Sequence, residues 1–382
     1  MTQPGSETVS SRSPGEGRGE QRSWPPPLSS REKALARSRT YQLLSRLVLE
    51  GVTPESLPTL QALPELAQAL PHPLDLDRLA AAHHRLWGFN VFPFEGIFRG
   101  TENLLGGPVT EQVLHSYARS GFQPELSSQS GDHLGLELAF LAFLAGAEAD
   151  AWEDDRPHVA RTIQERQRLF LDEHLLPWLP ALVQAVGQQL ASPLHPPEEQ
   201  PREQSEEQPG GQSSAQELGI FVLAVELALE LALVHRQELG EADLLAPGPS
   251  LTLPLLPDLL EEESTGLKEI AAHLLVPAYS GFYLSRDDIG RLAQRHQLPR
   301  GFGERRTMLT NLLQAAARFD SLPGVLTSLE ELVAEWRKRY RTPPVAVYPF
   351  MQPIAQAWGH RLQATLGILE VLRAGSVDQA AN

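Results

Sequence analysis

The segment from 130 to 144 constrains the fold of this chain more than any other. Its apolar side chains recur at helical spacing and also fill most of the remaining helix surface; they are Leu134, Leu136, Leu138, Phe140, Leu141, Phe143 and Leu144. A helix that is apolar on nearly all sides belongs at the centre of a helical bundle. It is expected over 132–147, with Ser130 or Asp132 as its cap. Its start, which carries Asp132 and His133, is expected to reach the surface.

The rest of the chain also follows helical rather than strand patterns. No run of residues alternates apolar and polar side chains convincingly over the length of a strand. Apolar residues at helical spacing predict further helices over 31–50, 74–87, 110–120, 157–176, 217–238, 286–296, 304–319, 323–339 and 353–372. Pro177 is expected to break or kink the helix before it. The predicted fold class is therefore all-α, a helical bundle with a C-terminal helical extension.

Composition divides the chain into helical and irregular segments. Residues 1–30 are rich in Ser, Gly, Pro and Arg and are expected to form a disordered tail. An all-helical core is expected over 31–240, interrupted by a flexible acidic loop over 191–216. A helical extension over 241–382 follows, and the sequence assigns no role to it.

The formal net charge of −16 limits the choice of partners. It argues against a nucleic-acid partner, because nucleic-acid phosphates require a basic surface. It favours a basic peptide as partner. It is equally consistent with an acidic protein that has no basic partner.

Residue usage excludes several kinds of site. The absence of cysteine rules out disulfides, thiolate nucleophiles and thiolate metal sites. The adjacent His83 and His84 would point about 100° apart on a helix, so no metal site is expected. The N-terminus lacks a secretory signal. The most apolar run, 219–235, carries Glu226 and Glu230, which favours a buried helix over a membrane span.

Three motifs occur in order along the core. They are Phe92-Pro93-Phe94-Glu95-Gly96-Ile97-Phe98, then Gly121-Phe122 with Asp132-His133-Leu134 and Glu137-Leu138, then Phe170, His174-Leu175 and Trp178. In order and spacing they resemble the TorD/DmsD/NarJ-like chaperones, which mature molybdenum-containing redox enzymes. The likeness covers 41–235. Where that family usually has proline before its Asp-His pair, this chain has 129–131, Gln-Ser-Gly.

The resemblance implies a function and a set of site residues. It implies a cytoplasmic, system-specific chaperone with no enzymatic activity and no cofactor. Its partner would be the apo catalytic subunit of a molybdopterin-containing oxidoreductase, that subunit's twin-arginine signal peptide, or both. Direct membrane insertion is not expected, and homodimer formation is left open. The client-binding residues would be Tyr41, Trp87, Phe92, Pro93, Phe94, Glu95, Gly121, Phe122, Asp132, His133 and Glu137.

These residues suit a signal peptide, and they also have a simpler interpretation. Aromatic side chains can form the groove that binds the apolar stretch of such a peptide. Carboxylates pair with its arginines, and the candidates are Glu95, Glu102, Glu125, Asp132 and Glu137. In the simpler interpretation the aromatics are core residues, while Asp132 and His133 cap a helix. The sequence leaves both open.

A loop in the C-terminal extension supports an alternative function. Glycines and arginines before a helix can hold an anion, a nucleotide or part of a pterin dinucleotide, and here they are Arg300, Gly301, Gly303, Arg305 and Arg306. This would suit a helical enzyme or nucleotide-binding protein. The spacing is neither a Walker loop nor a dinucleotide fingerprint, and no Gly-x-Ser-x-Gly elbow occurs. The net charge opposes a DNA-binding helix–turn–helix, and a plain helical hairpin fits equally.

Overall fold

Helices make up this structure, which confirms the predicted all-α fold class. The computed structural model describes residues 1, 28–101, 106–124, 130–190, 215–240, 249–260 and 265–380. Over these residues no strand forms, and a single isolated antiparallel bridge joins Phe94 to His133. The predicted tail and acidic loop lie almost wholly outside the described residues, and so do Glu102 and Glu125.

The described residues up to 240 form the helices α1 (Ser30–Leu49), α2 (Leu57–Ala62), α3 (Pro64–Ala69), α4 (Leu76–Arg85), α5 (Glu95–Arg99), α6 (Pro108–Arg119), α7 (Leu134–Glu153), α8 (Pro157–Phe170), α9 (Leu176–Gly187) and α10 (Ala215–Gly240). Of these, α1, α4, α6, α7, α8 and α10 begin close to their predicted starts, whereas α2, α3, α5 and α9 were not predicted as separate helices. Two π-helical turns, η1 (Leu86–Asn90) and η2 (Leu171–Leu175), follow α4 and α8, and a 3-10 turn follows α9, η3 (Gln188–Leu190). The short helix α5 has no apolar periodicity long enough to predict it.

The C-terminal part is also helical. Its elements are α11 (Leu267–Leu274), α12 (Pro277–Ser280), α13 (Arg286–Arg295), α14 (Arg305–Arg318), α15 (Leu322–Arg339), η4 (Val345–Val347), η5 (Pro349–Met351) and α16 (Gln352–Ala380). Ser285 caps α13, as its position predicts. Its hydroxyl accepts the Asp288 N–H at 3.0 Å, and the Asp288 carboxylate accepts the Ser285 N–H at 2.8 Å.

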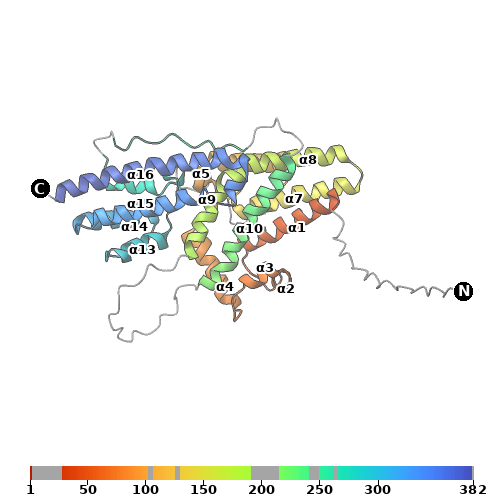
Figure 1. Ribbon diagram of the computed structural model, residues 1–382, viewed down its shortest axis with the longest axis horizontal. Coiled ribbons are helices and arrows are strands. Elements are labelled where there is room, and N and C mark those ends of the chain that lie inside the picture. Colours follow the sequence, from red (N-terminus) through yellow and green to blue (C-terminus); the bar gives the residue numbers. More distant parts are fainter. Residues whose placement is uncertain are drawn as a thin grey trace.

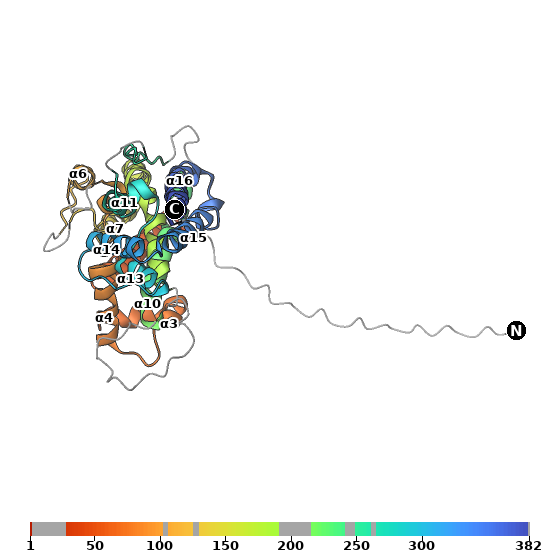
Figure 2. The same ribbon diagram turned by 90° about the vertical axis from the view of Figure 1, so that its left-hand side faces the viewer.

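The molecule is elongated, with α9 and α10 in its middle. Figure 1 shows α13 to α16 toward one end and α1, α7 and α8 toward the other. Figure 2, turned by 90°, keeps α3 and α4 at the end of the vertical axis that lies away from α16. The apolar helix α7 packs most extensively against α1 and α8, which lie with it toward the same end of the molecule.

The start of α7 is buried, which contradicts the prediction that it reaches the surface. Asp132 and His133 are only 1% and 3% exposed. His133, rather than Ser130 or Asp132, is the N-cap, and its Nδ1 accepts the Gly135 N–H at 3.1 Å. A distant part of the chain buries this helix start, because the loop before α5 packs against it. The spacing of apolar residues along α7 cannot predict such a tertiary contact.

The chain stays helical from α8 through η2 into α9, so helical structure does not end at Pro177 (Figure 1). The turn η2 absorbs the change of direction, with the Leu176 N–H bonded to the Leu171 carbonyl. Pro177 has no N–H to donate to the carbonyl of Glu173, four residues earlier. Arg99 Nη1 donates to that carbonyl instead, at 2.8 Å.

The C-terminal helices share one apolar core with the preceding bundle. Trp358 on α16 donates its Nε1–H to the Pro177 carbonyl at 3.0 Å. Trp336 on α15 donates to the Gln188 side chain at 2.7 Å. Both indoles are fully buried, so α15 and α16 are anchored beside α9. The division into a core and an extension at residue 240 stays a prediction.

The helix α10 is long and apolar enough to cross a membrane by length and composition alone. In this structure it contacts α1, α4 and α9. His235 and Arg236 near its end are buried within the protein. These contacts are those of a core helix, as expected for the apolar run 219–235.

Candidate functional site

The loop before α5 is held against the start of α7 by main-chain bonds. The Leu134 N–H donates to the Pro93 carbonyl at 2.8 Å, and the Glu95 N–H donates to the Asp132 carbonyl at 2.9 Å. The Phe94 ring packs edge-on against the His133 ring, with centroids 4.9 Å apart. The aromatic-proline motif and the Asp-His motif therefore form one structural unit.

Asp132 fixes the first turn of α5 through its side chain. Its Oδ2 accepts the Gly96 N–H at 2.9 Å. A Cβ atom on residue 96 would lie only 2.9 Å from that same oxygen, so the approach requires glycine. Asp132 is therefore a positioning residue for α5 in this conformation.

Glu95 ties α5 to the turn η2 and to α6. Its carboxylate forms an ion pair with Arg99, and His174 Nδ1 lies within hydrogen-bonding distance of Glu95 Oε2, at 3.2 Å. The other ring nitrogen of His174 lies 3.1 Å from Ser116 Oγ on α6.

Glu137 is a third buried carboxyl group in this region. Burial above all, and then the charges of Glu95 and Asp132, raise the pKa of Glu137 well above its ordinary value. Trp178 Nε1 donates to Glu137 Oε2 at 3.3 Å. Glu137 Oε1 has no hydrogen-bond partner among the described residues. Burial thus favours the protonated, uncharged form of Glu137.

Replacing Glu137 by glutamine is expected to increase stability more at high pH than at low pH. The folded state keeps this carboxyl protonated where the unfolded chain has released its proton, so wild-type stability falls as pH rises above the ordinary glutamate pKa of 4.5. The loss is up to about 1.4 kcal/mol per pH unit. Glutamine mimics the protonated form, so the variant should not show this loss of stability at high pH. Urea unfolding of both proteins at about pH 5 and about pH 8 measures the effect; a constant difference between them would contradict the raised pKa.

The predicted acids of the core are not free to pair with a bound peptide. Glu95 and Glu137 are 0% exposed and Asp132 is 1% exposed. Each also contacts a group of the protein itself. The expectation that these three carboxylates face a partner's arginines does not fit this conformation.

A polar cleft of about 520 Å³ opens beside this buried unit. Arg99 and His174, whose side chains both contact the Glu95 carboxylate, are part of its lining. Exposed side chains of α6 and η2 complete much of it, namely Glu111, Gln112, His115, Arg119 and Glu173. The cleft therefore connects the buried carboxylates to solvent through Arg99 and His174.

A second cavity, of about 660 Å³, is lined by Phe92 and Ile97. Phe92 is the half-buried member of the aromatic-proline motif. The Arg305 guanidinium from α14 lies over the Phe92 ring, 5.7 Å from its centroid. This cavity therefore joins the predicted client site to the predicted anion loop.

Only part of the predicted anion loop lines this cavity. Arg305 and Arg306 line the cavity, whereas Arg300, Gly301 and Gly303 do not. The Arg300 side chain bonds the side chain of Gln294 instead.

The remaining predicted site residues lie apart from the unit around α5. Tyr41 is buried on α1, with its hydroxyl 3.1 Å from His235 Nδ1. Trp87 is buried in η1, and Phe122 packs within an aromatic cluster of the core. Gly121 follows α6 with a φ of +74°, as expected for a C-terminal cap glycine. These positions fit core and capping roles.

The histidine pair predicted not to bind metal serves packing. His83 Nε2 lies 2.9 Å from the Val48 carbonyl oxygen, and the His84 ring is edge-on to Phe89. Over the described ranges, no group of three or more His, Cys, Asp or Glu side chains is placed to hold a metal ion.

Sequence patterns did not select Arg99 or Ser116 for the site. A signal for Arg99 exists, because Glu95 and Arg99 lie four residues apart on one helix face. Ser116 offers none, since its contact with His174 joins segments far apart in the chain. His174 belongs to the third motif, but the motif alone does not assign it to the site.

The buried unit is contained in a segment that resembles known proteins. Residues 55–184 match the family model called nitrate reductase delta subunit. This is a family of molybdoenzyme maturation chaperones. The match confirms the resemblance predicted from the three motifs, which all lie inside it. The helix α10 and the C-terminal helices lie outside the matched range. No curated protein matches the chain.

Proposed function

We propose that this protein is a cytoplasmic chaperone that binds the apo catalytic subunit of a molybdoenzyme during cofactor insertion and before export. The nitrate reductase delta subunit match supports the general class of this function. The chaperone needs no turnover, only a higher affinity for the immature client than for the mature one.

The client is proposed to dock at the polar cleft beside α5. The observation that carries this is the fixed wall formed by Arg99 and His174, which line the cleft and are both paired with buried Glu95. Side chains held in place before binding lose little conformational entropy when a partner arrives. Asp132, His133 and Glu137 then act behind this wall as positioning residues rather than as contacts.

The signal peptide is proposed to use the exposed carboxylates of the same cleft. Glu111 and Glu173 are both exposed and line it. An arginine side chain pairs well with a carboxylate through parallel N–H donors. These two residues take the role that the sequence assigns to Glu95, Asp132 and Glu137, which lie inside the protein.

The first test is recovery of the client from the native host. The tagged full chain is purified gently, and the proteins that accompany it are identified by mass spectrometry. We expect a molybdoenzyme catalytic subunit that lacks its cofactor. If the protein is recovered alone from cells that express molybdoenzymes, the proposed function is wrong.

The substitution Glu173→Arg is expected to weaken binding of the client's twin-arginine peptide about tenfold, because one charge-assisted pair is replaced by repulsion. Fluorescence anisotropy with a labelled synthetic peptide measures the dissociation constant. Glu55→Arg is the matched control, since Glu55 is exposed, makes the same charge change and does not line the cleft. Equal losses in the two variants, or no loss in either, would contradict a signal-peptide site in this cleft.

A further inference from the structure

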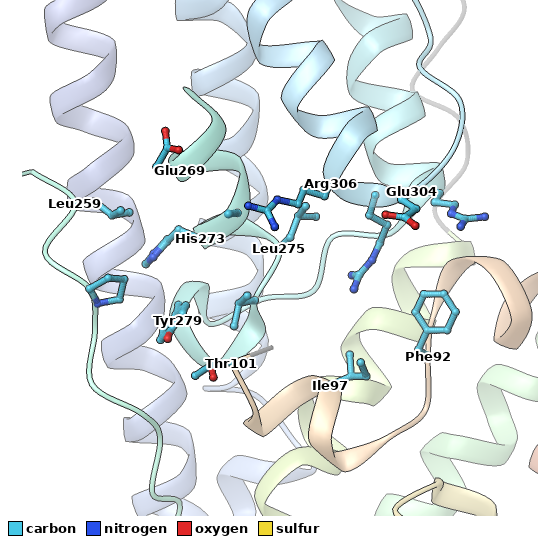
Figure 3. A pocket seen from close by; sticks show the side chains of 15 residues that line it. Phe92, Ile97, Thr101, Leu259, Glu269, His273, Leu275, Tyr279, Glu304 and Arg306 are labelled. Carbon is cyan, nitrogen blue, oxygen red and sulfur yellow. The ribbon is translucent and has the colours of Figure 1, made fainter. Parts of the chain in front are cut away.

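The cavity beside Phe92 has the composition of a small-molecule site. Its volume of about 660 Å³ lies within the range of about 300–1,000 Å³ that is usual for ligand pockets. Figure 3 shows its walls, with Phe92 and Ile97 on one side and His273 and Tyr279 on another. Most of the cavity lining lies outside the segment matched to the chaperone family.

His273 is the feature of this cavity that packing does not explain. Its side chain lies in the cavity wall although the residue is only 3% exposed. Neither Nδ1 nor Nε2 has a hydrogen-bond partner among the described residues. A buried polar group without a partner destabilises the folded state, so two on one ring call for a reason.

The imidazole of His273 is neutral at physiological pH. Burial chiefly, and then the charge of Arg361, lower the pKa of His273 to about 4. A neutral ring presents one N–H donor and one nitrogen acceptor. It can therefore hydrogen-bond a hydroxyl, a carbonyl or a ring nitrogen of a ligand.

The lining of this cavity carries more positive than negative side chains. Arg286, Arg305 and Arg306 outnumber the two carboxylates, Glu269 and Glu304. This is a local cationic excess in a chain whose net charge is −16. An anionic group is therefore attracted to this cavity rather than to the surface in general.

The arginines differ in how firmly they are held. Arg305 is buried, donates to the Leu284 carbonyl at 3.1 Å and lies 4.4 Å from the centroid of the Tyr283 ring. Arg306 is exposed and forms no ion pair within the described part of the chain. In Figure 3 it extends from the start of α14 toward His273. Arg306 is thus available to a ligand without first breaking an internal bond.

We propose that this cavity binds a small organic anion. Its apolar body would lie against Phe92, Ile97 and Leu275. Its carboxylate or phosphate group would lie at Arg306 and the first turn of α14, where free N–H groups also favour an anion. A further polar atom would bond His273. Such binding goes beyond the proposed chaperone function and requires no client.

The test uses three related probes on the purified full chain. Naphthoate, naphthyl phosphate and neutral naphthamide share one apolar body, and isothermal titration calorimetry compares their dissociation constants. We expect one of the two anions to bind in a one-to-one ratio and about tenfold more tightly than naphthamide. Which anion binds better distinguishes a carboxylate ligand from a phosphate ligand. Binding of naphthamide equal to both anions, or no binding of any probe, would overturn the proposal.

Matched variants locate the binding. Arg306→Glu is expected to abolish the preference for the anion, whereas Arg318→Glu, an exposed position at the other end of α14, should keep it. His273→Leu is expected to weaken anion binding about tenfold without lowering the melting temperature, because it removes unpaired buried atoms. A stability loss in His273→Leu with unchanged binding would show a purely structural histidine and overturn its assignment. Equal effects of the two arginine variants would overturn the location.

Discussion

Replacing Asp172 by alanine is expected to lower the free energy of unfolding by about 3–5 kcal/mol. Asp172 accepts from Arg236 Nε at 2.5 Å and from Arg168 Nη1 at 3.1 Å. All three side chains are at most 9% exposed. Alanine would remove the carboxylate that offsets the desolvation of Arg236 and part of that of Arg168, which keeps its pair with Glu165. Urea or guanidinium unfolding of the two proteins measures the difference.

Glu165 supplies the matched control for this prediction. It also binds Arg168, but its side chain is 54% exposed. Solvent screens an exposed pair, so Glu165→Ala is expected to cost less than about 1 kcal/mol. If the two substitutions cost the same, burial does not determine the strength of these ion pairs. A small effect of Asp172→Ala alone would indicate that water reaches the arginines.

Replacing Gly281 by alanine is expected to cost more than about 3 kcal/mol, because two penalties combine. Gly281 has a φ of +83°, a conformation that side chains with a Cβ atom rarely adopt. A Cβ atom there would also lie 2.7 Å from the backbone nitrogen of Leu362 on α16. Backbone cannot move aside as a flexible side chain can, so α12 and α16 would have to separate. Thermal unfolding followed by circular dichroism measures the loss.

Gly290 provides the contrasting substitution. It lies inside α13, and no atom outside its own helix comes within 4 Å of a Cβ atom built there. Gly290→Ala is therefore expected to stabilise the protein by up to about 1 kcal/mol, through helix propensity. A loss of stability in Gly290→Ala, or none in Gly281→Ala, would contradict the packing described for these glycines.

Structural features that depend on contacts between residues close in the sequence could be predicted from the sequence. The helix α7 is an example, because Leu134, Leu138 and Leu141 recur at helical spacing and all three are 0% exposed. The cap at Ser285 is another, since its partner Asp288 lies three residues further on. Both depend on contacts within a turn or two of helix.

The candidate site could be predicted only in part, because its contacts join distant segments. The family resemblance brought Phe94 and His133 into one predicted site, and their rings do touch. It did not predict that Asp132 would be buried, since that depends on where Pro93 and its neighbours lie in three dimensions. Spacing along a helix describes which residues share a face, but not what covers that face.

The cavity residue His273 shows the same limit more strongly. A single histidine on an apolar helix face carries no motif. Its two unpaired nitrogens and its position opposite Arg306 are properties of the folded protein alone. Only Arg305 and Arg306 of this cavity's polar groups could be selected from the sequence.

Pro177 has no backbone N–H, and this affects a residue far from it in the sequence. With an ordinary residue at 177, a helical N–H could bond the Glu173 carbonyl and compete with Arg99 for it. In this structure the Glu173 carbonyl instead accepts a hydrogen bond from Arg99, which lies 74 residues earlier in the chain. Arg99 is thereby oriented at the cleft with the help of Pro177, which is itself buried. The shape of the cleft surface is thus determined in part by a residue in the interior of the protein.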